Sequence, residues 1–84
     1  MRDAMLYYVY IIQTVAAPER FYVGSTDNVT RRLQEHNVGK NPHTSKFGPW
    51  KLKTYVAFSS KTQALLFERY LKTQSGRAFA RKRL

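Results

Sequence analysis

The sequence predicts a small α+β protein in which helices flank a three-stranded, mainly antiparallel sheet, in the order ββαβαα. Two strand-like segments near the N-terminus precede an amphipathic helix, a third strand-like segment and two further helical segments. With 84 residues, 43% of them hydrophobic, we expect one domain over residues 1–84 with one modest core. The absence of cysteine excludes disulfides, a thiolate metal site and a cysteine nucleophile. We expect a cytoplasmic protein that does not interact with a membrane.

The first two strands are expected at residues 6–13 and 20–24, paired as a hairpin. The first segment, LYYVYIIQ, is rich in β-branched and aromatic residues, which favour strands. In the second, Tyr22 and Gly24 share one side because alternate residues of a strand point the same way. The two predicted faces of the first strand are Tyr8, Tyr10 and Ile12 against Tyr7, Val9 and Ile11.

The first helix is expected from about Asn28 to His36, with Asp27 as its N-cap. The stripe that a small domain normally buries, at i, i+3, i+4 and i+7, is then Val29, Arg32, Leu33 and His36. Structural interpretations exist for the two polar members. Arg32 can extend its head to solvent along an apolar stem, and His36 can interact with the helix dipole.

The middle of the chain is expected to form a loop followed by the third strand. Residues 37–49 contain two glycines, two prolines and two asparagines, which favour turns. The segment Trp50–Phe58 (WKLKTYVAF) is rich in strand-forming residues. Simple alternation along it places Lys51, Lys53 and Tyr55 on one face.

The C-terminal third is expected to form two helices. Ser60, with Gln63 three residues later, fits a capping box that opens a helix ending near Thr73. Gly76 is expected to break this helix before a short basic one. Glu68 falls on or beside the buried stripe. An ion pair with the lysine one turn later is its structural interpretation, whereas a carboxylate facing a basic surface also suits a divalent cation held against phosphate.

The charge balance points to a polyanionic partner. Fifteen Lys and Arg residues against five Asp and Glu residues give a formal net charge of +10. After His36 the chain has eleven basic residues and a single acid, Glu68. Nucleic acid is the commonest cytosolic polyanion. A solubilising surface, association with the ribosome and contact with anionic lipid remain as alternatives.

Five polar side chains, taken together, suit phosphodiester hydrolysis: Tyr10, Tyr22, Arg32, His36 and Glu68. Each alone fits a structural role, but all five lie on faces that the predicted fold could turn toward one cleft. A carboxylate can hold Mg²⁺, and an arginine can neutralise charge that builds on the phosphate. A tyrosine can activate water, and a histidine can orient that tyrosine. A glycine at the end of the second strand would let a ligand approach.

At these residues the chain resembles the GIY-YIG endonuclease superfamily, and within it the small stand-alone bacterial members. Its two naming motifs correspond to Tyr8–Tyr10 and Tyr22–Gly24. The helical arginine and the histidine one turn later correspond to Arg32 and His36, and the helical glutamate to Glu68 in ALLFERYLK. The resemblance covers nearly all of the chain. Two departures are a tyrosine in place of the first motif's glycine and a C-terminal tail without the asparagine that many members carry there.

The resemblance implies an endonuclease that hydrolyses DNA phosphodiester bonds with Mg²⁺ or Mn²⁺ and little base-sequence specificity. Nicked, branched or single-stranded DNA are the expected substrates. By the same resemblance, Tyr10 and Tyr22 are paired site tyrosines, Arg32 stabilises the transition state, and Glu68 is the sole carboxylate metal ligand. Tyr22 is favoured as general base, with Tyr10 and His36 in support.

The expected nucleic-acid contacts rest on the motifs, on the loop and on charge. DNA is expected ahead of RNA as the partner. A non-catalytic or weakly active nucleic-acid-binding module of the same fold is the alternative function. The expected contacts are Gly24, Ser25, His43, Thr44, Lys46, Lys51, Lys53, Lys72 and Arg77.

Overall fold

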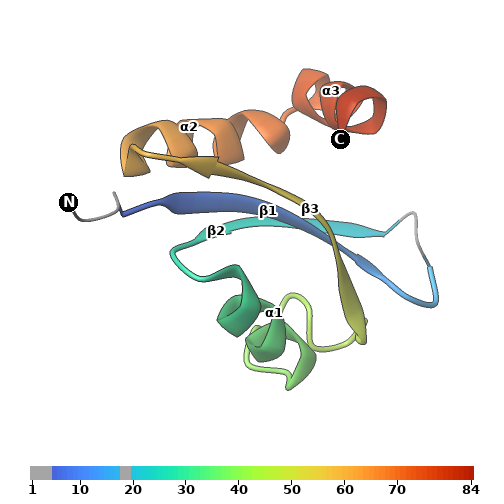
Figure 1. Ribbon diagram of the computed structural model, residues 1–84. Coiled ribbons are helices and arrows are strands. Elements are labelled where there is room, and N and C mark those ends of the chain that lie inside the picture. Colours follow the sequence, from blue (N-terminus) through green and yellow to red (C-terminus); the bar gives the residue numbers. More distant parts are fainter. Residues whose placement is uncertain (1–4, 18–19) are drawn as a thin grey trace.

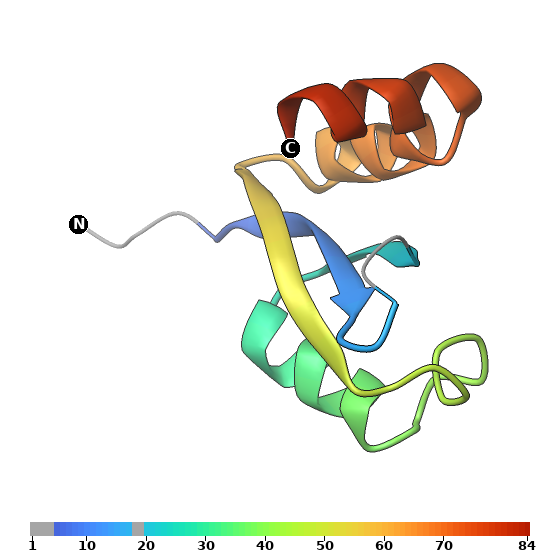
Figure 2. The same cartoon turned by 90° about the vertical axis from the view of Figure 1, so that its right-hand side faces the viewer.

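The computed structural model describes residues 5–17 and 20–84 and places a three-stranded sheet between two helical layers (Figure 1). The elements are β1 Tyr7–Thr14, β2 Phe21–Thr26, α1 Val29–Asn37, β3 Trp50–Phe58, α2 Lys61–Leu71 and α3 Gln74–Arg83. The sheet has the order β2-β1-β3 with both pairs antiparallel. One face carries α1 and the other α2 and α3 (Figures 1 and 2). The predicted α+β class and element order are confirmed.

The alternation of β1 divides the core between the two faces of the sheet. On one face Val9 and Ile11 form a buried cluster with two residues of α2. On the other face the buried cluster is Tyr10, Ile12 and Trp50, packed against Tyr22 and Leu33. The predicted faces of this strand are therefore confirmed. No helix among the described residues has the length and apolar character needed to cross a bilayer.

The start of α1 differs from the prediction, because its N-cap is Asn28 rather than Asp27. Oδ1 of Asn28 accepts a hydrogen bond from the Arg31 amide at 2.9 Å. The Asp27 carboxylate instead pairs with the Arg31 guanidinium at 2.7 Å. Asparagine and aspartate are comparably good caps, so residue type alone could not separate these neighbouring positions.

One irregularity in β3 changes which of its side chains share a face. Its pairing with β1 shifts by one residue between Ile11 and Ile12, which leaves Lys53 as the extra residue. The prediction that Lys51, Lys53 and Tyr55 share a face is therefore wrong. Lys53 lies on the side of α3, whereas Tyr55 lies on the side of α1.

The two C-terminal helices meet at a close contact that requires glycine. The predicted cap at Ser60 is confirmed, since its Oγ accepts a first-turn amide at 3.2 Å. The first of the two helices ends earlier than predicted, and Thr73 caps α3 by accepting the Gly76 amide at 3.1 Å. Gly76 therefore lies inside α3 and does not break a helix. A Cβ there would lie 2.6 Å from the Tyr70 carbonyl carbon, so the glycine lets α3 pack directly on α2.

The loop between α1 and β3 is fastened at both of its ends. Asn37 Nδ2 donates to the Trp50 carbonyl oxygen at 3.0 Å, and its Oδ1 accepts the Trp50 amide at 2.6 Å. The Trp50 indole donates to the Thr44 carbonyl oxygen at 2.9 Å. These bonds hold Thr44 against the α1 face of the sheet, although it belongs to a loop.

Candidate active site

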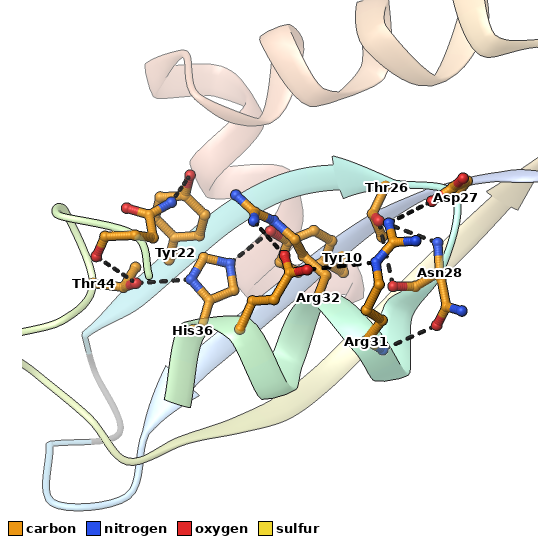
Figure 3. A network of polar contacts seen from close by, with 11 residues as sticks. Tyr10, Tyr22, Thr26, Asp27, Asn28, Arg31, Arg32, His36 and Thr44 are labelled. Carbon is orange, nitrogen blue, oxygen red and sulfur yellow. Dashed lines mark hydrogen bonds and ion pairs between the residues drawn. The ribbon is translucent and has the colours of Figure 1, made fainter. Parts of the chain in front are cut away.

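Four polar side chains converge on the α1 face of the sheet (Figure 3). Tyr10 comes from β1, Tyr22 from β2, and Arg32 and His36 from successive turns of α1. Tyr22 pairs with Ile12 across the ladder, so both tyrosines point to the same face. The centroid of the His36 ring lies 5.7 Å from that of Tyr10 and 5.0 Å from that of Tyr22.

A buried chain of hydrogen bonds runs from Tyr10 through His36 into the loop. The Tyr10 hydroxyl lies 2.7 Å from His36 Nε2, and Thr44 Oγ1 lies 2.7 Å from Nδ1. The Thr44 hydroxyl donates to the Asn41 carbonyl oxygen at 3.4 Å, so its oxygen accepts the proton of Nδ1. In a neutral imidazole Nε2 is then an acceptor, and Tyr10 donates to it. No sequence pattern marks the Thr44 contact, because the loop has no periodicity.

Burial favours the protonation states that this chain requires. It raises the pKa of Tyr10 to about 12, although a hydrogen bond and the charge from Arg32 act in the opposite direction. Burial, and then the charge of Arg32, lowers the pKa of His36. At neutral pH Tyr10 is therefore a phenol that can donate, and the neutral form of His36 is favoured.

Arg32 is partly exposed and is oriented by Glu35, a residue that the sequence interpretation missed. Its Nη1 lies 2.7 Å from Glu35 Oε1. This hydrogen bond raises the pKa of Arg32 and lowers that of Glu35. The nearby Tyr10 hydroxyl adds to the rise in the pKa of Arg32. The i, i+3 spacing of Arg32 and Glu35 is the sequence signal that could have identified this pair. Arginine has five N–H donors, so some of them stay available for an anion.

Gly24 makes room for Tyr10 rather than for a ligand. A Cβ at this position would lie 2.7 Å from Cζ of Tyr10 and closer still to its hydroxyl oxygen. Gly24 is itself buried. The tyrosine ring occupies the space that the missing side chain leaves, and the nucleic-acid contact expected at Gly24 stays a prediction.

Tyr22 differs from Tyr10 in the state of its hydroxyl. The side chain is half-buried. Its oxygen has one long contact, 3.5 Å from Asn41 Nδ2, in which the amide is the donor. Within residues 5–17 and 20–84 no acceptor takes the Tyr22 hydroxyl proton. Of the two tyrosines, Tyr22 is thus the one whose oxygen is available for chemistry.

Glu68 approaches this cluster from α2, next to β2. Its Oε1 accepts a hydrogen bond from the Ser25 hydroxyl at 2.7 Å, and its Oε2 accepts one from Lys72 Nζ at 3.0 Å. The predicted i, i+4 ion pair between Glu68 and Lys72 is thus confirmed. After the larger effect of burial and that of Tyr22, the charge of Glu68 also raises the pKa of Tyr10. The carboxylate is therefore within electrostatic reach of the tyrosine.

The Glu68 carboxylate fits a divalent cation that draws most of its ligands from water and substrate. The described residues contain no group of three or more His, Cys, Asp or Glu side chains that could hold a metal ion. The Glu68 side chain is 19% exposed, and an ionised carboxylate has acceptor sites beyond the two in use. Mg²⁺ typically binds one or two carboxylates and completes its octahedron with water and phosphate oxygens.

The residues expected to contact nucleic acid differ in exposure. Thr44 is 1% exposed and its hydroxyl is engaged by His36, so its observed role is structural, and the contact expected there stays a prediction. The hydroxyl of Ser25 donates its hydrogen bond to the Glu68 carboxylate and so helps to orient it. The exposed members are His43, Lys46, Lys51, Lys53, Lys72 and Arg77. Of these, three lie along one groove: Lys53, Lys72 and Arg77.

Comparisons with known proteins agree with the resemblance in the sequence. Residues 6–83 match the model of the GIY-YIG catalytic domain. One relative is a structure-specific endonuclease subunit SLX1 homolog of Giardia intestinalis, 38% identical over 65 residues. Another is the structure-specific endonuclease subunit SLX1 of Debaryomyces hansenii, 43% identical over 72 residues. These matches cover 73% and 77% of this chain but 18% and 21% of those proteins, so the chain spans about a fifth of their length.

A solved structure extends the match to almost the whole chain. The solution NMR structure of the UPF0213 protein BH0048 from Bacillus halodurans is similar, with a TM-score of 0.55 and 31% sequence identity. The match covers 93% of this chain and 84% of that one. Sequence and fold therefore support the same family.

Proposed function

Because the chain belongs to the GIY-YIG catalytic domain family, we propose that it is a divalent-metal-dependent endonuclease that hydrolyses DNA phosphodiester bonds. The family membership predicted from the sequence motifs is confirmed. The observation that carries the proposal is the convergence of Tyr10, Tyr22, Arg32 and His36, with the Glu68 carboxylate bonded to the neighbouring strand residue Ser25 and within electrostatic reach of Tyr10. The net charge of +10 supports a polyanionic substrate.

Arg32 is the proposed binder of the reacting phosphate. Glu35 holds part of its guanidinium in place, and its partial exposure lets the remaining donors reach an anion. Planar N–H donors fixed in advance stabilise charge that builds on phosphate oxygens during attack, without reorganisation at that moment. When bound at Glu68, a divalent cation supplies Lewis-acid polarisation of the phosphoryl oxygen and stabilisation of the leaving 3′-oxygen.

Tyr22 is the proposed general base, and Tyr10 a positioning residue. Tyr22 would release its own hydroxyl proton to solvent, and its oxygen would then take a proton from the water that attacks phosphorus. Tyr10 cannot serve in this way at neutral pH, because burial raises its pKa to about 12 and its proton is donated to His36. It instead holds His36 in a fixed position. This agrees with the prediction that favoured Tyr22.

DNA of branched or nicked structure is the proposed substrate. The curated relatives are named as structure-specific endonucleases, which supports recognition of DNA shape rather than of base sequence. The exposed lysines and arginines suit phosphate contacts, which position a nucleic acid without reading its bases. The metal is proposed to be Mg²⁺ or Mn²⁺, on the strength of the single carboxylate Glu68.

The test compares nicking by two matched carboxylate variants. Supercoiled plasmid and a flap or three-way-junction DNA are incubated with the wild type, Glu68→Gln or Asp27→Asn, in Mg²⁺, Mn²⁺ or EDTA. Asp27 has an exposed ion pair with Arg31 and serves as the control for lost charge. We expect nicking by the wild type and Asp27→Asn only with metal, and none by Glu68→Gln, while all three proteins bind DNA. Equal behaviour of the wild type and Glu68→Gln under every condition would refute the nuclease and favour a non-catalytic binding module.

A further inference from the structure

A groove lies between the sheet and α3, on the side of the sheet opposite α1. Its volume is about 680 Å³. We call it the basic groove, because four cationic side chains line it: Lys53, Lys72, Arg77 and Arg81. Its remaining lining is mainly apolar and includes Phe21, Ile11 and Val23 of the sheet.

Two of the four cationic side chains have neither an ion pair nor a hydrogen bond in the described part of the chain. Lys72 pairs with Glu68 at 3.0 Å, and Lys53 donates to the Leu84 carbonyl oxygen at 2.7 Å. Arg77 and Arg81 form no ion pair within residues 5–17 and 20–84. They lie four residues apart on α3, a spacing at which like charges repel. The fold therefore tolerates a local repulsion that a bound anion would relieve.

The apolar lining of the groove indicates which kind of anionic partner fits it, a duplex or an unpaired strand. Phe21 is 44% exposed, although the other apolar residues that line the groove are buried or half-buried. An aromatic ring available at such a site can stack on a nucleic-acid base, whatever the base sequence. A duplex keeps its bases stacked inside and would leave this ring uncovered. An unpaired strand offers both bases for the floor and phosphates for the arginines.

The basic groove and the candidate active site lie on opposite faces of the sheet, and both include residues of the edge strand β2 and of α2 or their direct partners. Tyr22 lines the groove, and its ring stands edge-on to His36 at 5.0 Å between centroids. Lys72 lines the groove as well and is the ion-pair partner of Glu68. A strand that passes Glu68 at the sheet edge formed by β2 would therefore reach Lys72 and, beyond it, the groove.

We propose that the basic groove binds the unpaired strand of a branched DNA, with phosphates at Arg77 and Arg81 and a base on Phe21. This inference rests on the proposed function, since it names the part of the substrate that leaves the same site. It gives the protein a physical means of preferring structured DNA to intact duplex. The duplex arm would be held by charge alone, and the unpaired arm by charge and stacking together.

The test measures binding in EDTA, so that no cleavage is needed. Fluorescence anisotropy is recorded for a single-stranded oligonucleotide, a blunt duplex and a duplex with a single-stranded flap, at several salt concentrations. The groove variant is Arg77→Ala/Arg81→Ala. The matched control is Lys82→Ala/Arg83→Ala, which removes the same charge from the same helix outside the groove.

We expect the groove variant to lose about tenfold in affinity for single-stranded and flap DNA, and less for the duplex. Its plot of log affinity against log salt should become shallower by about 1.4, since each phosphate contact on a single strand contributes about 0.7. The control should keep most of the wild-type slope. Phe21→Ala should lose about tenfold on the single strand with an unchanged slope, because stacking carries no charge. Phe21→Leu should bind the single strand as weakly as Phe21→Ala, because leucine has no aromatic ring on which a base could stack.

Equal losses in the groove variant and the control, or equal losses on duplex and single strand, would overturn the groove assignment. So would displacement of the oligonucleotide by poly-glutamate of matched charge, which would mean that any anion suffices. If the wild type nicks DNA and the losses are equal, only the groove assignment fails. If no nicking occurs but the groove variant is selectively impaired, the endonuclease proposal fails and the groove assignment stands.

Discussion

Replacing Tyr10 by phenylalanine tests whether its hydroxyl holds His36 in the core. The change keeps the ring, which is 2% exposed, and removes the donor that lies 2.7 Å from His36 Nε2. His36 is 1% exposed, so water cannot replace that donor without a rearrangement. An acceptor left buried and unsatisfied costs about 1–3 kcal/mol. We expect the free energy of unfolding to fall by that amount, a large share of the stability of a domain this small.

Urea unfolding followed by tryptophan fluorescence measures this loss directly. Trp50 is the only tryptophan, and it belongs to the same buried cluster as Tyr10. The matched control is Tyr8→Phe, because Tyr8 packs edge-to-face on Tyr55 and its hydroxyl has no hydrogen bond with a described residue. We expect the control to change the free energy of unfolding by less than about 0.5 kcal/mol. If Tyr10→Phe is no more destabilised than Tyr8→Phe, the buried chain through His36 is refuted.

Further expected outcomes concern packing, pH and chemistry. Gly24→Ala should destabilise by about 1–3 kcal/mol in the same urea experiment, because a Cβ would overlap the ring packed on it. Gly76→Ala should also destabilise, despite the higher helix propensity of alanine, because α2 backbone atoms lie within 3 Å of the new Cβ. Burial lowers the pKa of His36 below its unfolded value, so the unfolded chain binds the proton first as pH falls. As the pH falls below about 6.5, the free energy of unfolding of the wild type should therefore decrease. The exposed-histidine control His43→Gln should show the same decrease, and His36→Gln a smaller one. Tyr22→Phe should slow nicking by roughly 10²–10⁴-fold without weakening DNA binding, and an unchanged rate would exclude it as general base.

Features set by local sequence were predictable to within a few residues. The alternation of β1 correctly gave its two faces, because each face of a strand repeats every second residue. The cap at Ser60 was also predictable, since its hydroxyl and the first-turn amides are neighbours in the chain. The stripe on α1 gave both Arg32 and His36, which the structure places with one more apolar residue of that stripe, Leu33, on the same face.

Features set by contacts distant in the sequence were not predictable from it. One partner of His36 is Thr44, which is held in place by a hydrogen bond from the Trp50 indole, and no periodicity relates these positions. The register shift in β3 depends on how two strands fit together, so alternation along one strand placed Lys53 wrongly. Glycine is typical of a helix end, which is why the sequence predicts a helix break at Gly76, whereas its role is to let α2 and α3 approach closely.

Because the candidate site lies against the buried core, some of its residues affect stability as well as activity, and this limits which variants can reveal a catalytic role. Tyr10 and His36 belong both to the buried hydrogen-bond chain and to the candidate cluster, so lost activity in their variants would not by itself make them catalytic. The other three, Tyr22, Arg32 and Glu68, are each partly exposed. Changes there can remove a proton acceptor, a phosphate donor or a metal ligand while the core keeps its packing. Variants of these three residues that stay folded are therefore the ones whose kinetics report on chemistry.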